Sequence, residues 1–180
     1  MLGFTFQAGK KFAIEKYGEA VWEKAAAESG VGTKDYVRHK AYPDSEVAAM
    51  FTAIAKTVGV ELPEVIEAFG VFSAPAFIEM AGVLVRPEWR TLDLLEHVEE
   101  KIHTRIRDQN AEAKPPFLVV TRLSPDSVRI VYASSRKLCP AVIGITKGVA
   151  QGFHETVSLV EERCMYRGDP SCAIVVTLQH

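Results

Sequence analysis

The feature that most constrains the fold of this sequence is a change in apolar spacing at the tandem proline Pro115–Pro116. Before it, from Gly3 to about Asn110, apolar residues recur with the period of amphipathic helices. After it, apolar and polar residues alternate in short runs bounded by turn residues, which is typical of β-hairpins. The two patterns together predict an α+β fold in which helices pack against an antiparallel sheet.

The first part of the chain predicts helices with identifiable starts. One helix follows "YPDSE", with Asp44 as its N-cap. Its apolar stripe is formed by Val47, Met50, Phe51, Ile54 and Val58. A second helix begins near Pro63, and Gly70 and Pro75 predict a bend or break within it. A third, longer helix is predicted from Thr91 to about Gln109.

The second part predicts two hairpins and one helix. The runs "FLVVTRL" and "SVRIVYAS" flank the turn signal "SPD", and the runs "ETVSLVEERC" and "CAIVVTL" flank "RGDP". Between the hairpins, one helix is predicted from about Cys139 to Phe153. No repeat or linker interrupts the chain, so residues 1–180 are expected to form one domain with a four-stranded antiparallel sheet.

Composition excludes several classes of partner. The chain has 180 residues, 48% of them hydrophobic and 24% charged, with a formal net charge of -2 and no Lys/Arg-rich run. We therefore expect neither nucleic acid nor a membrane as partner. There is no signal peptide and no long apolar segment, so a cytoplasmic protein is expected. Three cysteines, an odd number, argue against a secreted disulfide framework.

Two histidines lie on the long predicted helix. With Leu95, Val98, Ile102 and Ile106 as its buried stripe, His97 falls on the solvated side and His103 falls at the edge of the stripe. An imidazole at such an edge can reach a cleft and coordinate a metal. The alternative is a boundary histidine that is only hydrogen-bonded.

The stretch "VYASSRK" places Tyr132, Ser134 and Arg136 at alternate positions. In an extended chain these three side chains point to one side, where they form a strip of hydrogen-bond donors suited to an anion. The alternative is an ordinary amphipathic strand with a polar outer face.

The order of these features resembles the haem nitric oxide/oxygen-binding (H-NOX) family over essentially the whole chain. The matching features are a histidine on a long helix, the tandem proline, the Y-x-S-x-R strand and the final hairpin, together with "KYGEAVWE", "AYPDSEV" and "EAFG". The resemblance implies haem b bound with His103 as proximal iron ligand and with Tyr132, Ser134 and Arg136 on its propionates. It implies that Pro116 presses on the porphyrin.

The resemblance also implies a fold in which an N-terminal helical subdomain, residues 1–60, and a haem-proximal α/β subdomain, residues 61–180, enclose the haem. Family members that hold O2 stably usually carry a tyrosine where this chain has Ala141. We therefore expect binding of NO, weaker binding of CO, and little stable O2 complex. Candidate distal wall residues are Phe4, Phe69, Phe72, Ser73 and Phe77. The hydroxyl of Ser73 is a candidate donor, whereas phenylalanines at helical spacing usually belong to a plain apolar core.

The cysteines suggest a second site. Cys164 and Cys172 flank one hairpin turn, and Cys139 begins the preceding helix. Some H-NOX members hold a structural zinc with four cysteines here, but Glu161 replaces one of them in this chain. Zinc held by the three thiols with Glu161, His154 or water is one interpretation. Three reduced, buried cysteines without a metal are the other.

The sequence is compatible with three functions. The first is a non-catalytic haem sensor of NO that regulates a partner in trans, in bacteria typically a histidine kinase or a cyclic-di-GMP enzyme (diguanylate cyclase or phosphodiesterase). The chain ends just after its last predicted strand, so a stand-alone sensor is expected. The second is a zinc or thiol redox sensor in which haem is secondary. The third is a haem enzyme such as a peroxidase, which the apolar distal side argues against.

Overall fold

The computed structural model describes residues 1–81, 86–109 and 114–180. The predicted end of the helical part, at about Asn110, lies outside these residues. The elements in chain order are α1 (Gly3–Tyr17), α2 (Glu19–Ser29), η1 (Val31–Thr33), α3 (Asp44–Val58), α4 (Leu62–Ala81), α5 (Thr91–His97), η2 (Val98–His103), α6 (Thr104–Gln109), β1 (Phe117–Ser124), β2 (Ser127–Ala133), α7 (Cys139–Gly152), β3 (Thr156–Arg163), η3 (Met165–Arg167) and β4 (Cys172–Gln179).

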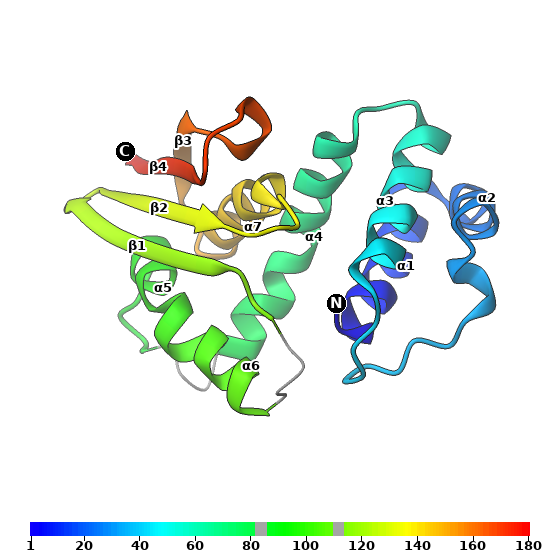
Figure 1. Ribbon diagram of the computed structural model, residues 1–180. Helices are drawn as coiled ribbons and strands as arrows, with labels where there is room; N and C mark the ends of the chain where they lie inside the picture. The colour runs from blue at the N-terminus through cyan, green and yellow to red at the C-terminus, as the bar shows by residue number, and fades with distance from the viewer. Residues whose placement is uncertain (82–85, 110–113) are drawn as a thin grey trace.

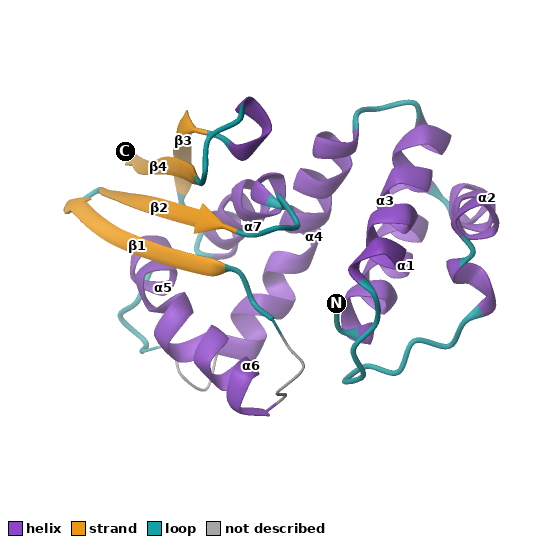
Figure 2. Ribbon diagram, in the orientation of Figure 1, coloured by secondary structure: helices purple, strands orange, loops and turns teal. Residues whose placement is uncertain are grey.

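Helices α1, α2 and α3 gather at one end of the molecule and the sheet lies at the other, with α4 and α7 between them (Figure 1). The strand order is β1-β2-β4-β3, and every neighbouring pair is antiparallel. Helices α5 and α7 contact the sheet; in Figure 2 the helices are purple and the strands orange. The α+β architecture, both hairpins and the helix between them are therefore confirmed.

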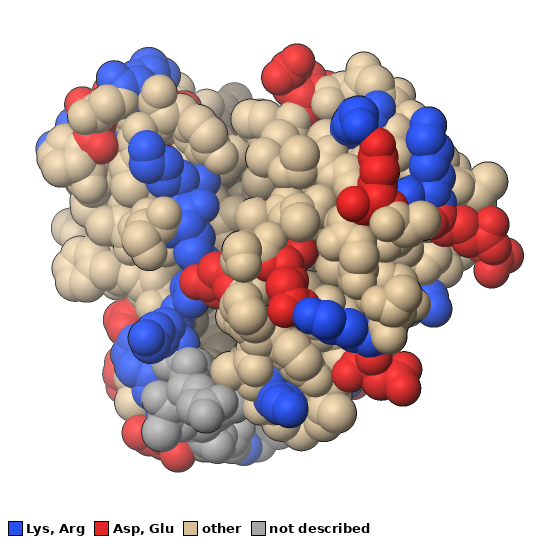
Figure 3. Space-filling view, turned by 45° about the vertical axis from the view of Figure 1, so that its right-hand side comes forward, with Lys and Arg blue, Asp and Glu red and all other residues tan. Residues whose placement is uncertain are grey.

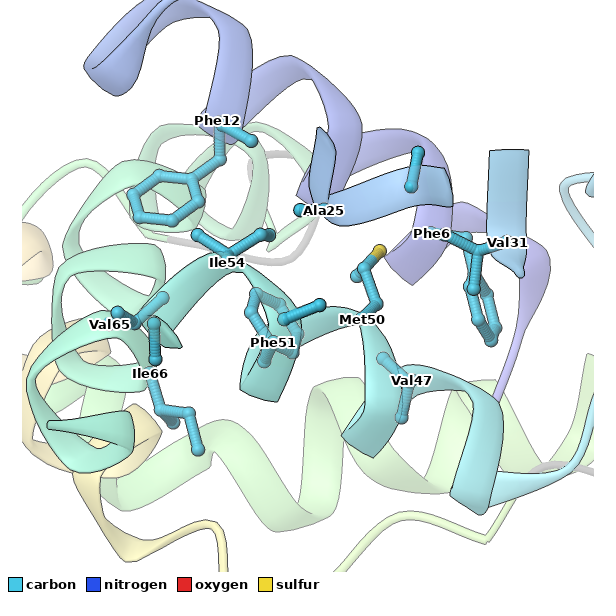
Figure 4. Close-up of a cluster of buried hydrophobic side chains, with 14 residues drawn as sticks. Phe6, Phe12, Ala25, Val31, Val47, Met50, Phe51, Ile54, Val65 and Ile66 are labelled. Atoms are coloured by element: carbon cyan, nitrogen blue, oxygen red, sulfur yellow. The ribbon is translucent and has the colours of Figure 1, made fainter. Parts of the chain in front are cut away.

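The N-terminal end has its own apolar core, which α1, α2 and α3 form together with the start of α4 (Figure 4). Met50 and Ile54 of the predicted stripe are fully buried there, in one cluster with Phe12 and Val65 of the neighbouring helices. A second core lies under the sheet, where the inward-facing residues of β2 and β4 alternate with outward-facing ones. The apolar faces predicted from the helical spacing form the first core, and those predicted from the strand alternation form the second.

Helices α4 and α7 approach closely through glycines. A Cβ placed on Gly144 would lie 2.0 Å from the Glu67 carbonyl oxygen, and one on Gly70 would lie 2.6 Å from the Ala141 carbonyl oxygen. Only residues without a side chain fit at these contacts. Helix α4 runs unbroken from Leu62 to Ala81 with Pro75 inside it, so of the predicted bend or break the break does not occur. Packing along α7 holds the helix together where its sequence alone favours interruption.

Charged side chains of both signs are interspersed on the face shown in Figure 3. Within the described parts of the chain, no helix combines the length and the apolar character needed to cross a bilayer.

Candidate functional site

His103 ends a π-helical turn, η2, that interrupts the long helix between α5 and α6. Its side chain is 12% exposed, which confirms its predicted position at the edge of the buried stripe. Nδ1 lies 2.7 Å from Oε2 of Glu99, one helical turn earlier. Because a carboxylate only accepts hydrogen bonds, Nδ1 carries the ring proton, and the lone pair of Nε2 is left for a metal.

The π turn is marked by a wider hydrogen bond, in which the Thr104 N–H bonds to the Glu99 carbonyl five residues earlier. Such turns are rare and occur frequently at functional sites. His97 lies just before this turn and is half-buried. Its ring stacks on Trp89 with centroids 4.1 Å apart, so its predicted solvated position is wrong. His97 Nδ1 also lies 2.8 Å from the Asp93 carbonyl oxygen, which gives this histidine a structural role.

Glu99 is a residue of this site that the sequence analysis missed. Its second oxygen accepts from Arg107 Nη2 over 2.6 Å, so one carboxylate joins the imidazole to a guanidinium. Burial works to raise the pKa of Glu99, but the hydrogen bonds from Arg107 and His103 outweigh it and leave the pKa lowered. Glu99 and His103 are four residues apart, a spacing that brings side chains together on a helix, so the signal was present in the sequence.

The Y-x-S-x-R segment is not one extended strip. Tyr132 lies in β2, which ends at Ala133, and Ser134 and Arg136 lie in the turn that follows. Ser134 Oγ accepts from the Arg136 N–H over 3.2 Å, and the Lys137 N–H bonds to the Ser134 carbonyl. The predicted alternation is therefore wrong after Tyr132, because a serine hydroxyl offers the backbone a local partner in place of the sheet ladder.

The turn nevertheless keeps the three side chains together. Tyr132 is 2% exposed, and its hydroxyl oxygen accepts from the Leu138 N–H over 3.0 Å. Burial raises the pKa of Tyr132, against the opposing effects of hydrogen bonds from Ser134 and Leu138. The phenol therefore stays protonated at neutral pH and remains a donor.

Arg136 ties this turn to two distant segments. Its Nε donates to Asp44 Oδ2 over 2.7 Å, and its Nη1 donates to the Lys114 carbonyl over 2.6 Å. Asp44 is the first residue of α3, and Pro43 occupies the cap position, so the predicted N-cap role of Asp44 is wrong. Instead, Asp44 Oδ1 accepts from the Met1 ammonium over 2.8 Å. Burial acts to raise the pKa of Asp44. The hydrogen bonds and charges of its two cationic partners outweigh burial, so the pKa is lowered.

These residues fit a haem by the chemistry of their donors. A guanidinium has five N–H donors, and the two bonds named above leave others for an anion. Tyr132 accepts from Ser134 and Leu138 and keeps its own hydroxyl proton, so with Arg136 the turn offers a neutral and a charged donor suited to buried propionates. Pro116 is half-buried and lies between Lys114 and β1, in the segment that Arg136 contacts.

The predicted distal residues divide into different environments. Phe69 and Phe72 make edge contacts with Phe12, at centroid distances of 5.6 Å and 5.5 Å, and pack on the N-terminal core. Phe4 lies under the guanidinium of Arg38. Half-buried Phe77 and Ala141 lie on α4 and α7, and Ala141 packs against the same N-terminal core.

Ser73 is buried on α4, and its hydroxyl donates to the Phe69 carbonyl over 2.7 Å. This bond within the helix uses the only proton of the hydroxyl.

The three cysteines come together within the second core. The sulfurs of Cys139, Cys164 and Cys172 and one carboxylate oxygen of Glu161 all lie within 4.8 Å of one another. His154 is exposed and outside this group, so the structure brings Glu161 and not His154 to the cysteines. Burial, followed by the neighbouring thiols, raises the pKa of Cys139, and burial with the Glu161 carboxylate raises that of Cys164.

A tetrahedral zinc, with bonds to sulfur of about 2.3 Å, holds its ligands roughly 3.8 Å apart, which is less than the 4.8 Å limit of this group. The Met165 N–H lies 3.3 Å from the Cys172 sulfur, as a donor that would support a metal-bound thiolate.

Comparisons with known proteins place the chain in a family. Residues 2–161 match the family model described as Haem-NO-binding. The chain is 25% identical over 171 residues to soluble guanylate cyclase gcy-35 of Caenorhabditis elegans, and 22% identical over 157 residues to soluble guanylate cyclase 89Db of Drosophila melanogaster. The matches cover 91% and 86% of this chain but only 25% and 23% of those two proteins.

Solved structures agree on the fold. An H-NOX protein from S. oneidensis in the Fe(II)NO state superposes with a TM-score of 0.91 at 23% identity, covering 100% of both chains. An Fe(II) unliganded H-NOX protein from K. algicida superposes with a TM-score of 0.88 at 17% identity, covering 100% of this chain and 97% of that one. With the family model matching nearly its whole length, this chain belongs to the Haem-NO-binding (H-NOX) family of haem-based gas sensors.

Proposed function

We propose that this protein is a sensor of nitric oxide, in which ferrous haem is held by His103 and signalling passes to a separate partner protein. The observation that carries the proposal is the state of His103. A carboxylate already holds its Nδ1, so the ring is oriented and Nε2 is the coordinating atom. Bound haem would supply the ferrous iron to which NO binds.

The propionate contacts are assigned to Tyr132, Ser134 and Arg136. Arg136 already donates to Asp44 and Lys114, and the Tyr132 hydroxyl oxygen already accepts from Leu138, which fixes the turn before any ligand is added. Pro116, in the segment that Arg136 holds, is proposed to contact the face of the porphyrin. A site whose donors are already oriented loses little entropy on binding an anion.

Ligand selectivity follows from the absence of a free donor among the described distal candidates. Ala141 has no polar group, and the hydroxyl proton of Ser73 is bonded to the Phe69 carbonyl. Phe4, Phe69, Phe72 and Phe77 add only apolar surface. A polar Fe–O2 unit gains nothing from such walls, whereas NO binds ferrous haem without a distal donor. We therefore propose NO as the ligand, CO as a weaker one, and little stable O2 complex.

The output is proposed to act in trans, on a histidine kinase or a cyclic-di-GMP enzyme, and the protein itself is proposed to be non-catalytic and cytoplasmic. The similarity to two soluble guanylate cyclases supports a signalling role. The matched segment is about a quarter of their length. NO binding would weaken the bond to His103 and shift residues 1–60 relative to 61–180. The Asp44–Arg136 pair joins those two subdomains.

The test of the ligand assignment is the ferrous visible spectrum of the haem-loaded protein. We expect His103→Gly to lose the wild-type spectrum and to regain it when imidazole is added, while His97→Gln remains like the wild type. Adding NO should change the wild-type spectrum, and air should leave no stable O2 complex. A His103→Gly protein with an unchanged spectrum would contradict the proposal. Autophosphorylation of candidate kinases, with and without NO, then tests the partner.

A second candidate function, a zinc or thiol redox sensor, is favoured by the grouping of Cys139, Cys164, Cys172 and Glu161. We expect about one zinc per chain in untagged protein. Cys164→Ser and Glu161→Gln should each lower zinc retention, whereas Glu162→Gln, the exposed neighbour, should not. Metal analysis of the dialysed proteins measures this directly. No zinc in the wild type would leave the cysteines as a small apolar cluster.

A further inference from the structure

The carboxylate of Glu99 lies between the imidazole of His103 and the guanidinium of Arg107. One oxygen is 2.7 Å from Nδ1 of His103, and the other is 2.6 Å from Nη2 of Arg107. Glu99 is the second residue of the π turn that His103 ends, so the same local widening of the helix carries both side chains. Neither contact contributes to the apolar core, because the Glu99 side chain is 36% exposed and that of Arg107 is 42% exposed.

We propose that Glu99 is a positioning residue that sets the strength of the iron–histidine bond, and that Arg107 weakens its influence. This rests on the proposed function, in which His103 is the iron ligand. A carboxylate that accepts the Nδ1 proton makes the imidazole more electron-rich, and the bond from Nε2 to a metal becomes stronger. A guanidinium on the second oxygen draws negative charge away from the first. The two residues therefore act on the imidazole in opposite directions.

The consequence concerns the step in which NO binds and the iron–histidine bond breaks. On release from bound haem, Nε2 of His103 would keep the electron pair of that bond and Nδ1 would keep its proton, so the imidazole would remain neutral. No proton donor or redox partner is needed. A stronger pull by Glu99 resists this release, and Arg107 favours it. The balance of the two contacts thus sets how completely NO switches the protein from the six-coordinate to the five-coordinate state.

The first measurement needs no haem. In the apo protein, the nitrogen-15 spectrum of the His103 ring should show the proton on Nδ1 in the wild type. Glu99→Gln should keep that tautomer, because its amide oxygen still accepts from Nδ1, whereas Glu99→Ala should give a mixture. A single Nδ1–H tautomer retained in Glu99→Ala would contradict the positioning role.

The second measurement is the iron–histidine stretching frequency of the ferrous protein by resonance Raman spectroscopy. We expect a downward shift in Glu99→Gln and an upward shift in Arg107→Gln, and the five-coordinate fraction of the NO complex should rise in the first and fall in the second. Glu100→Gln is the matched control: it removes an exposed carboxylate from the same turn, paired with Lys101 instead of His103. Opposite shifts distinguish electronic control from structural damage, which would move both variants the same way.

The outcomes separate this inference from the proposed function. Haem still bound through His103, with equal stretching frequencies in the wild type, Glu99→Gln and Arg107→Gln, would overturn the role of Glu99 alone. Loss of the spectrum in His103→Gly with recovery by imidazole establishes the ligand independently. An unchanged His103→Gly spectrum would overturn both.

Discussion

Arg136 and Asp44 are 92 positions apart in sequence, yet the Nε of one donates to the carboxylate of the other over 2.7 Å. The pair joins the turn after β2 to the first residue of α3. The Met1 ammonium lies on the other oxygen of Asp44, so one carboxylate pairs with two cations. Asp44 thereby links the N-terminus, helix α3 and the turn after β2, which carries the proposed propionate contacts.

Asp44→Asn should destabilise the apo protein by about 1 kcal/mol at pH 7, a modest value because the Asp44 side chain is 44% exposed. Folding lowers the pKa of Asp44, so the contribution is fully present above the ordinary Asp pKa of about 3.9. It is lost as the pH falls through the folded-state pKa. Urea unfolding at pH 7 and at pH 3 should show the difference between variant and wild type shrinking in acid. Exposed Glu23→Gln on α2 is the control.

Tyr132→Phe should cost about 1–2 kcal/mol, because it removes the hydroxyl that accepts from the Leu138 N–H in a buried environment. The same change should weaken haem retention if the phenol also contacts a propionate. Urea unfolding of the apo protein measures the first effect, and haem transfer to apomyoglobin measures the second. Tyr166→Phe, at a residue that is 50% exposed, should change neither.

Gly144→Ala should destabilise the fold by about 1–3 kcal/mol, although alanine is the better helix former. The added Cβ would meet the Glu67 carbonyl at 2.0 Å, and backbone cannot move aside without separating α4 from α7. Gly152→Ala is the matched comparison on the same helix, because its Cβ would meet only the end of the Ile78 side chain. In thermal unfolding, the melting temperature of Gly152→Ala should be far higher than that of Gly144→Ala. Equal losses of melting temperature would count against the close approach of α4 and α7.

Ser73→Ala should leave ligand selectivity unchanged, since the Ser73 proton is already bonded to the Phe69 carbonyl. The rate at which the ferrous protein oxidises in air should match the wild type. Ala141→Tyr provides the opposite case, because it adds a hydroxyl where O2-binding relatives are expected to carry one, and it should prolong any O2 complex. A large change in Ser73→Ala would mean that its hydroxyl reaches the ligand.

The sequence by itself determined the elements and the identity of the chemical groups. Apolar spacing of 3.6 residues on one side of the tandem proline, and alternation on the other, decided where helices and strands form, because each period buries one continuous face. His103 at the edge of a stripe and the grouping of Cys164 with Cys172 followed from helix phase and hairpin closure. These are local properties, which neighbouring residues specify.

Only the tertiary structure decided how those groups are held. The π turn beneath His103, the turn that replaces an extended strip at Ser134, and the pairing of Asp44 with Arg136 each depend on hydrogen bonds formed or exchanged outside the regular periods. Likewise, α4 continues through Pro75 because packing against α7 offsets the helix-breaking preference of proline. At the Asp44–Arg136 pair and at Pro75 the deciding contacts join segments far apart in the sequence, so the residues beside each position do not specify them.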